Sequence, residues 1–242
     1  MRLDKYLSLS AVCSRKECAK AVRQGEVLVN GVCVKTASAS VDPQTDIVMF
    51  CGTPVLYHDY FYLMLNKPCG VVSATDAKGE TTVLDLLPER FHAKKMFPCG
   101  RLDKNTSGFV LMTNDGALAH HLLAPKTHVP KEYLFCVKYP LTAQEIEQLE
   151  QGIDIGEGIV TRPCQIHMQD AHQGIIILTE GKYHQIKRMM FAVHNQITSL
   201  SRISFAGIKL DSSLAPGEWR ELTDDERHIL YEYGKVSDKT ET

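Results

Sequence analysis

The chain lacks three features that would place it in other protein classes. No apolar run approaches the ~20 residues that a membrane-spanning helix needs, and Met1 to Lys5 contain no apolar segment of the kind found in a secretory signal. The eight cysteines include no C-x-x-C pair. The sequence therefore predicts neither a zinc site nor a disulfide framework. We expect a reduced, cytoplasmic protein that does not enter a membrane.

A strong net charge is also missing, but the charge that is present is unevenly distributed. The formal net charge is −2, yet residues 1–35 hold seven Lys and Arg against three Asp and Glu. The remaining residues hold 20 against 26. A basic N-terminal part on a mildly acidic body is expected when one part of a protein contacts the phosphates of a nucleic acid.

The N-terminal part predicts a compact basic surface. Ser14 and Glu17 form a capping-box pattern at the start of a helix that ends at Gly25. Asn30-Gly31, between two β-rich runs, predicts a tight hairpin. The cationic residues of the helix are Arg15, Lys16, Lys20 and Arg23. The last three repeat at i, i+4 and i+7 and so share one face, which can contact RNA phosphates; an ordinary solvated face explains them about equally well.

Three segments of this part resemble a small RNA-binding module first described in a ribosomal protein of the small subunit. They are M-R-L-D-K-Y-L, S-R-K-E-C-A-K and G-E-V-L-V-N-G, and the resemblance covers roughly residues 1–50. It implies recognition of RNA shape and backbone more than of sequence. Asp42-Pro43, Gly52-Thr53-Pro54 and the polar residues that follow indicate where the module ends. We therefore place the module at residues 1–56 and a linker at residues 57–60.

The most informative segment spans residues 100–112, G-R-L-D-K-N-T-S-G-F-V-L-M. It places Asp103 in a polar loop before a short apolar strand expected over 109–113, which Asn114-Asp115-Gly116 closes. Loops at the ends of buried strands are where catalytic and binding side chains concentrate. An isolated Asp in such a loop more often serves an Asx turn, so the loop alone leaves both roles open.

This segment closely resembles the active-site motif of the RsuA-type pseudouridine synthases, G-R-L-D-x-x-T-x-G-L-[LIV]-[LIV], with Phe109 in place of the commoner Leu. The resemblance implies that Asp103 is the catalytic carboxylate. The family's reaction breaks the N1–C1′ bond of uridine, turns the base and joins C5 to C1′. Because nothing is oxidised and no group is imported, we expect no cofactor.

A second motif of the same family is matched by residues 180–189, E-G-K-Y-H-Q-I-K-R-M, which follow an apolar run and open a helix. The resemblance implies that Lys187 pairs with Asp103 and so keeps the carboxylate ionised. Many relatives carry Arg at this position, and the adjacent Arg188 could take the role instead. Without the resemblance, both cations fit an exposed helix start equally well.

A third match, K-x-Y at Lys131-Glu132-Tyr133, implies that the Tyr133 ring stacks on the uracil and that its hydroxyl handles the C5 proton. A tyrosine on a strand is otherwise more often a core residue. Arg101 is expected to touch the phosphate backbone or to fill the gap left by an everted nucleotide. The residues assigned to RNA binding in this domain are Lys67, Arg101, His184, Gln185 and Arg188.

The order of elements predicts an α+β fold: a small N-terminal α/β RNA-binding module, then a mainly antiparallel-sheet catalytic domain over residues 61–234 and a disordered tail at 235–242. Strands are expected at 61–65, 109–113, 132–138, 165–168 and 174–179, and helices at 116–123, 142–152, 184–193 and 223–233. His120-His121 and His184 lack a third ligand at plausible spacing, so no metal site is predicted.

We therefore predict a pseudouridine synthase that acts on ribosomal RNA. His184 with Lys187-Arg188 points to small-subunit RNA, since large-subunit relatives more often carry Arg at the His position. The expected partner is ribosomal RNA or an assembling small subunit, and the enzyme is expected to be a monomer. The alternatives are a synthase for large-subunit RNA, an RNA N-glycosidase, and a non-catalytic RNA-binding or assembly factor.

Overall fold

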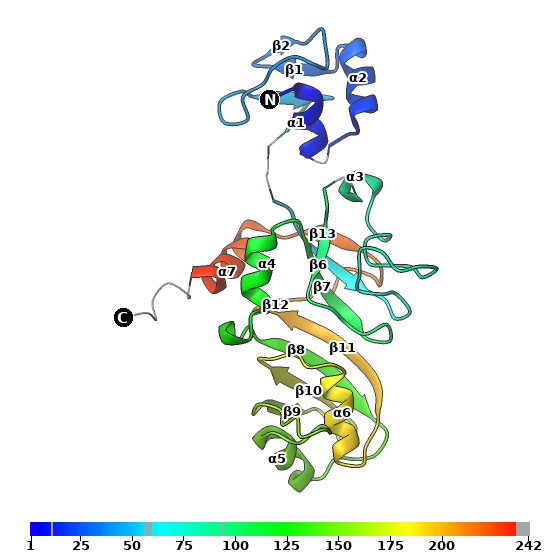
Figure 1. Cartoon of the computed structure of the whole chain (residues 1–242). Helices are drawn as coiled ribbons and strands as arrows, with labels where there is room; N and C mark the ends of the chain where they lie inside the picture. The colour runs from blue at the N-terminus through cyan, green and yellow to red at the C-terminus, as the bar shows by residue number, and fades with distance from the viewer. Residues whose placement is uncertain (11, 56, 58–59, 93, 236–242) are drawn as a thin grey trace. The chain divides into compact units, whose positions relative to one another are not determined.

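The computed structural model describes residues 1–10, 12–55, 57, 60–92 and 94–235. The chain forms two compact units, one made of residues 1–61 with 87–96 and the other of residues 62–86 with the chain from residue 97 onward (Figure 1). Residue 61 and residues 87–96, which the predicted division gave to the catalytic domain, thus group with the first unit. His58 and Asp59 of the predicted linker, and residues 236–242 of the predicted tail, lie outside the described residues. No helix in the described part of the chain is long and apolar enough to cross a membrane.

The first unit packs two helices against a four-stranded antiparallel sheet of order β2-β1-β3-β4. The helices are α1 (Leu3–Leu9) and α2 (Arg15–Gln24), and a short helix α3 (Glu89–His92) belongs to the same unit. The strands are β1 (Val27–Val29), β2 (Val32–Cys33), β3 (Val48–Phe50) and β4 (Thr53–Val55). The core is aliphatic, with Leu3, Leu7 and Val27 fully buried between helices and sheet.

Local signals in the sequence account for the ends of these elements. Ser14 and Glu17 form the predicted capping box at the start of α2, and Gly25 ends the helix in the left-handed conformation, with φ 75°. Asn30 and Gly31 form the predicted hairpin turn, with φ 52° and 78°. The interpretation of Gly52-Thr53-Pro54 was wrong. This segment does not end the module but forms the β3–β4 hairpin, and Pro54 is tolerated because β4 is an edge strand.

The second unit is built on a nine-stranded sheet with the path β13-β5-β7-β11-β8-β10-β9, while β6 pairs with β7 and β12 with β11. Its strands are β5 (Tyr62–Lys67), β6 (Phe97–Cys99), β7 (Ser107–Thr113), β8 (Lys131–Val137), β9 (Gln165–Met168), β10 (Gln173–Leu178), β11 (Ile197–Phe205), β12 (Ile208–Lys209) and β13 (Trp219–Glu221). Of its strand pairings among described residues, only β7 with β11 is parallel. The predicted mainly antiparallel α+β class is confirmed.

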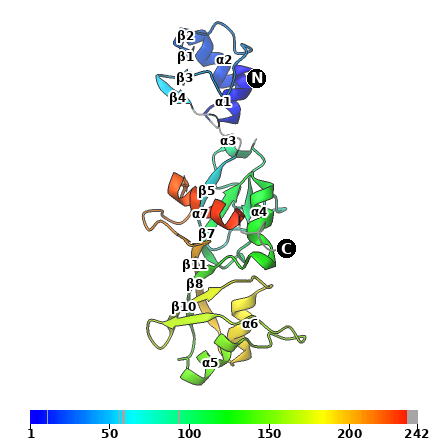
Figure 2. The same cartoon turned by 90° about the vertical axis from the view of Figure 1, so that its left-hand side faces the viewer.

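Two hydrophobic cores lie along this sheet. One packs β5 and β7 against α4 (Gly116–Leu123) and α7 (Asp224–Lys235), which lie side by side in Figures 1 and 2. The other packs β8 and β10 against α5 (Ala143–Gln151) and α6 (Gln185–Ala192). A 3₁₀ turn, η1 (Pro125–Thr127), follows α4. The site described below lies where β7, β8 and α6 approach one another.

The sequence prediction missed β11, the nine-residue strand that joins the two halves of the sheet. Its sequence, I-T-S-L-S-R-I-S-F, carries three serines and a threonine, which are common in loops. In the structure β11 is flanked by β7 and β8, so its backbone is paired on both sides whatever its composition. The strand therefore owes its existence to its neighbours more than to its residues.

Candidate active site

Asp103 lies in the loop between β6 and β7, and buried contacts hold this loop in place. The Ser73 hydroxyl donates to the Leu102 carbonyl oxygen at 3.0 Å and accepts from the Leu102 amide at 3.1 Å. The Thr106 amide donates to the Asp103 carbonyl oxygen at 3.0 Å, which closes a turn. The Asp103 side chain keeps 27% of its surface exposed. A rigid loop thus presents a carboxylate that solvent or a ligand can reach.

Lys67 was predicted to bind RNA, and the structure contradicts this. Its side chain is fully buried at the end of β5, and Nζ donates to the carbonyl oxygens of Pro68, Lys104 and Thr106 at 2.9, 3.3 and 2.8 Å. Burial lowers the pKa of Lys67 from 10.5 to about 8, partly offset by the nearby negative charge of Asp103. Lys67 therefore fixes the backbone of the Asp103 loop through the Lys104 and Thr106 carbonyl oxygens. Its buried side chain is not accessible to a phosphate.

Gly108 allows β11 to approach the start of β7 closely. It has φ +100°, and a Cβ built on it would lie 2.3 Å from the Arg202 carbonyl oxygen and 2.7 Å from the Arg202 amide nitrogen. Gly108 and Arg202 are register partners in the parallel pairing of β7 with β11. Only a residue without a side chain lets the two backbones meet here, which explains the second glycine of the G-R-L-D-x-x-T-x-G pattern.

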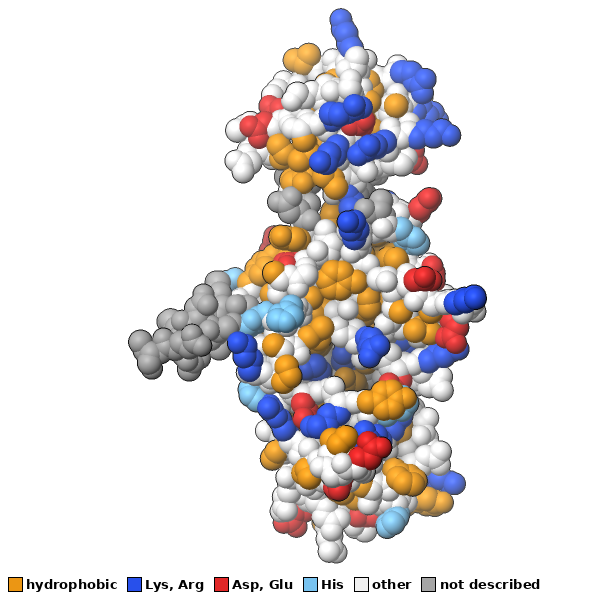
Figure 3. All heavy atoms as spheres, viewed as in Figure 1, with side chains coloured by type: hydrophobic (Ala, Val, Ile, Leu, Met, Phe, Trp, Pro, Cys, Tyr) orange, Lys and Arg blue, Asp and Glu red, His pale blue; other side chains and the backbone are white. Residues whose placement is uncertain are grey.

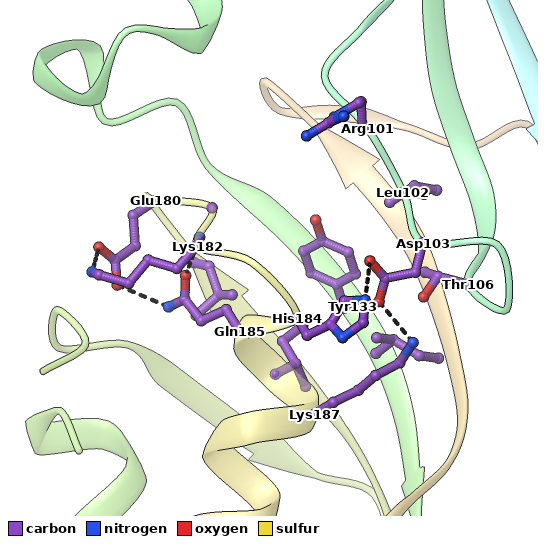
Figure 4. Close-up of a pocket in the computed structure, with 14 residues that line it drawn as sticks. Arg101, Leu102, Asp103, Thr106, Tyr133, Glu180, Lys182, His184, Gln185 and Lys187 are labelled. Atoms are coloured by element: carbon purple, nitrogen blue, oxygen red, sulfur yellow. Dashed lines mark hydrogen bonds and ion pairs between the residues drawn. The ribbon is translucent and has the colours of Figure 1, made fainter. Parts of the chain in front are cut away.

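The cation that pairs with Asp103 is Lys187, in the first turn of α6. Its Nζ donates to Asp103 Oδ2 at 2.7 Å. The sequence left Lys187 and Arg188 open, and the structure separates them: Arg188 points away and its Nε donates to the Ile155 carbonyl oxygen at 2.8 Å. Figure 4 shows the Asp103 carboxyl group between the Lys187 ammonium and the His184 ring. The guanidinium thus contacts a neighbouring loop, and the RNA-binding role of Arg188 stays a prediction.

His184 provides a second contact to the same carboxyl group. Its Nε2 lies 3.4 Å from Asp103 Oδ1, and its ring stacks on Tyr183 with centroids 3.9 Å apart. The residue caps α6 in the left-handed conformation, with φ 50°, which turns the ring toward the Asp103 loop. His184 therefore contacts the Asp103 carboxyl group directly. The sequence had suggested only that His184 binds RNA.

Gln185 was also predicted to bind RNA, but it is 4% exposed and serves the loop before α6. Its Oε1 accepts from the Lys182 amide at 2.9 Å and its Nε2 donates to Glu180 Oε1 at 2.8 Å. Burial by itself would raise the pKa of Glu180, but bonds from the Lys182 ammonium, the Arg162 amide and Gln185 lower it below its ordinary value. Glu180, Lys182 and Gln185 of the E-G-K-x-x-Q part of the motif are thus linked by polar contacts into a brace around the buried Gln185 side chain.

Tyr133, on β8, brings an aromatic ring to the Asp103 carboxyl group (Figure 4). Both residues line a pocket of about 100 Å³ with Arg101, Leu102, Thr106, Leu178, Ile186, Lys187 and Leu200. Arg101 is exposed and projects from the loop on the side away from Lys187. The pocket brings together a half-buried carboxylate, the Lys187 ammonium, the Tyr133 ring and apolar side chains. This arrangement suits nucleophilic attack by the carboxylate or electrostatic stabilisation of a positively charged sugar. Among the residues that the structure describes, no three His, Cys, Asp or Glu side chains converge on a metal position.

The cations predicted on the first unit are all exposed on α2: Arg15, Lys16, Lys20 and Arg23. Figure 3 shows Lys and Arg side chains gathered on the visible face of this unit. The inward face of α2 is formed by Cys18, Ala21 and Val22, which are buried. Cys33, on β2 of the hairpin, is exposed.

Two residues of the second unit carry no signal in the sequence. Ser73 is an ordinary serine in a loop, and nothing near it in the chain predicts its contact with Leu102. Arg202 is a fully buried guanidinium on the missed strand β11. An arginine within a polar run normally indicates a solvated surface, so only the tertiary structure reveals its burial.

Comparisons with known proteins agree with this geometry. A family model described as RNA pseudouridylate synthase matches residues 61–192, and an S4 domain model matches residues 1–47. A Bacillus subtilis (strain 168) protein named "Uncharacterized RNA pseudouridine synthase YtzG" is 47% identical over 236 residues, which is 96% of this chain and 99% of that protein. The Escherichia coli (strain K12) "Ribosomal small subunit pseudouridine synthase A" is 38% identical over 228 residues, 93% and 98% of the two chains. A crystal structure of a pseudouridylate synthase superimposes with a TM-score of 0.68 at 33% identity, covering 95% of this chain and 99% of the other.

Proposed function

This chain belongs to the RNA pseudouridylate synthase family and is a pseudouridine synthase, and we propose that it isomerises one uridine of small-subunit ribosomal RNA with Asp103 as its catalytic carboxylate. The observation that carries the proposal is the Asp103–Lys187 ion pair beside the Tyr133 ring in one pocket. The reaction needs a carboxylate close to C1′ or C6 of the everted uridine and a surface that holds the detached base.

Asp103 acts on the ribose or the base of a uridine that has left its stack. The N1–C1′ bond breaks, the base turns, C5 bonds to C1′, the C5 proton leaves and N1 takes up a proton. Asp103 serves either as the nucleophile or as the negative partner of the sugar cation, and both roles need its charge. The Lys187 ammonium donates to one oxygen of this carboxyl group at 2.7 Å, and His184 Nε2 lies 3.4 Å from the other, so both contacts hold the group in position.

Tyr133 holds the base while it is detached. Its ring stacks on the uracil, and its hydroxyl is the group placed to handle the C5 proton. A paired or stacked uridine must be everted to reach this pocket. Arg101, exposed at the pocket wall, contacts the backbone at this point or fills the gap that the nucleotide leaves.

The substrate class is supported by the relatives named for small-subunit ribosomal RNA and by the N-terminal S4 domain, whose exposed α2 cations suit phosphate contacts. The enzyme acts as a monomer in the cytoplasm, on ribosomal RNA or on an assembling small subunit. Its division into an RNA-binding module at 1–56 and a catalytic domain at 61–234 belongs to the same proposal.

One assay tests the function. Unmodified small- and large-subunit ribosomal RNA carrying C5-tritiated uridine is incubated separately with the protein. Tritium release from the small-subunit RNA, with the base retained in the chain, supports the proposal, and Asp103→Asn should abolish it while leaving RNA affinity nearly intact. Free uracil would indicate a glycosidase. Tritium release from large-subunit RNA alone would show that large-subunit RNA is the substrate. No tritium release from either RNA would indicate a non-catalytic RNA-binding protein.

A further inference from the structure

Arg202 is a buried cation with incomplete partners. Its side chain is 2% exposed on β11, and its Nε donates to the Phe109 carbonyl oxygen at 2.7 Å. Its Nη2 is buried without any hydrogen-bond partner. Among the described residues no carboxylate pairs with it, although a buried guanidinium usually has such a counter-ion.

A second cation lies close to the first. Lys131 on β8 is the register partner of Phe205 on β11, and its Nζ is 5.8 Å from the centre of the Phe205 ring. The Arg202 guanidinium lies 5.1 Å from the centre of the same ring. The one hydrogen-bond acceptor of Lys131 within the described structure is the Val129 carbonyl oxygen, at 2.8 Å. Two cations, each with a single hydrogen-bond acceptor, thus lie near the same aromatic ring. A bound anion would stabilise this pair of positive charges.

Both cations line a cavity of about 450 Å³ next to the proposed active site. Arg101, Arg162 and Lys182 also line it, and Glu180 is the one acidic residue of its wall among those that the structure describes. Glu180 is already engaged by Lys182 and Gln185. The cavity shares Arg101, Tyr133 and Lys182 with the Asp103 pocket. An RNA strand with one nucleotide in the Asp103 pocket would therefore extend into this cavity. Figure 3 shows Lys and Arg side chains around the hollow that crosses this unit.

We propose that Arg202 and Lys131 form a binding site for a phosphodiester group adjoining the everted uridine, an inference that rests on the proposed function for its substrate. A guanidinium with an unpaired N–H group and an ammonium are both cationic donors that proteins commonly use to bind phosphate oxygens. The site fixes the backbone on the side of the nucleotide opposite Lys187. It therefore orients the ribose toward Asp103 and takes no part in the bond rearrangement.

The test measures binding without turnover, with all proteins as full chains that also carry Asp103→Asn. Fluorescein-labelled octauridylate is titrated by anisotropy over a range of KCl concentrations. Lys131→Met and Arg202→Met should each weaken binding about tenfold at low salt, and each should reduce the slope of log affinity against log salt by about 0.7. Lys209→Met, an exposed lysine on β12 of the same sheet, is the matched control and should behave like the parent protein.

A second measurement identifies the anion. Triuridylate and its analogue with two neutral methylphosphonate linkages compete with the labelled probe. The parent should prefer the charged trinucleotide, and Lys131→Met should reduce that preference. Arg202→Met removes a buried side chain, so circular dichroism first establishes that it is folded; if it is not, Lys131→Met alone decides.

The proposal is overturned if Lys131→Met has the salt slope of Lys209→Met, or if its preference for charged linkages is unchanged. Failure of the proposed function gives a different result. Absence of tritium release from ribosomal RNA by the unmutated enzyme, with the Lys131 effect on binding present, would leave the anion site standing and overturn the synthase assignment.

Discussion

The ammonium of Lys187 donates to the Asp103 carboxylate at 2.7 Å across 84 positions of sequence. The two side chains come from different elements of the sheet domain, the β6–β7 loop and the first turn of α6. Each is anchored independently, the loop by Ser73 and Lys67 and the helix start by the Glu180–Gln185 brace. The pair is therefore prearranged before any substrate binds, which is the condition for electrostatic catalysis.

Replacing Lys187 should reduce turnover more than binding. Lys187→Met leaves Asp103 with His184 alone, so kcat for tritium release should fall by about 10²–10³-fold, while RNA affinity changes little. Lys187→Arg keeps the charge and should retain more activity than Lys187→Met. Lys209→Met serves as the control for removal of a lysine. Near-normal turnover in Lys187→Met would contradict the role of the ion pair.

Replacing Lys67 should loosen the Asp103 loop. Lys67→Met removes three hydrogen bonds to backbone carbonyl oxygens and leaves the buried carbonyl oxygen of Thr106 without this donor, which should lower the free energy of unfolding by about 2–4 kcal/mol and reduce kcat as well. Urea unfolding and the tritium assay measure the two effects. Lys104→Met, in the same loop, removes an exposed lysine whose ion pair with Glu80 lies at the surface, and its stability should stay within about 1 kcal/mol of the wild type. Equal effects of the two variants would refute the assigned role of Lys67.

Adding a methyl group at Gly108 should disrupt the β7–β11 pairing. The new Cβ would meet the Arg202 backbone at 2.3 Å, and φ +100° strains any L-residue. We expect Gly108→Ala to lower the free energy of unfolding by about 2–4 kcal/mol. Gly116→Ala, at the first position of α4 with open space around it, should be neutral or slightly stabilising. Thermal unfolding of the two proteins would test this, and a Gly108→Ala protein as stable as Gly116→Ala would sink it.

Lys131 should make stability depend on pH in a defined direction. Burial first, and then the charge of Arg202, lower its pKa from 10.5 to about 8. Below about pH 8 the ammonium is present in both states and its burial is destabilising. Between about pH 8 and 10.5 the folded protein has released the proton while the unfolded chain still binds it, so the wild type gains stability as pH rises.

Lys131→Met lacks this titrating group, so its stability relative to the wild type should decline between about pH 8 and 10.5. Urea unfolding of both proteins at several pH values provides the comparison. Because only their difference is used, the thiols and tyrosines that titrate in this range cancel. A difference that does not change with pH would show that Lys131 titrates normally in the folded protein.

The α2 cations should carry part of the salt dependence of RNA binding. The double variant Lys16→Gln with Lys20→Gln should reduce the slope of log affinity against log salt by about 0.7–0.9 for each phosphate that the helix no longer neutralises. Both side chains are exposed, so folding should be unaffected. The control is Lys209→Gln on the other unit. An unchanged slope in the double variant would exclude this helix face from RNA binding.

The sequence by itself determined the elements whose signals are local. The capping pair of Ser14 with Glu17 and the Asn30-Gly31 turn lie where they were expected, because each depends on residues within three positions of one another. The location of Asp103 before a buried strand belongs to the same class, since the polar loop and the apolar run are adjacent in the chain.

Only the tertiary structure decided which side chains meet. The choice of Lys187 over Arg188, the burial of Lys67 and Gln185 and the isolation of Arg202 depend on contacts between segments far apart in the chain. The missed strand β11 has the same cause, because its pairing is supplied by β7 and β8. Neighbouring residues of a helix, such as Lys187 and Arg188, point about 100° apart. The sequence does not show which distant segment lies next to each of them.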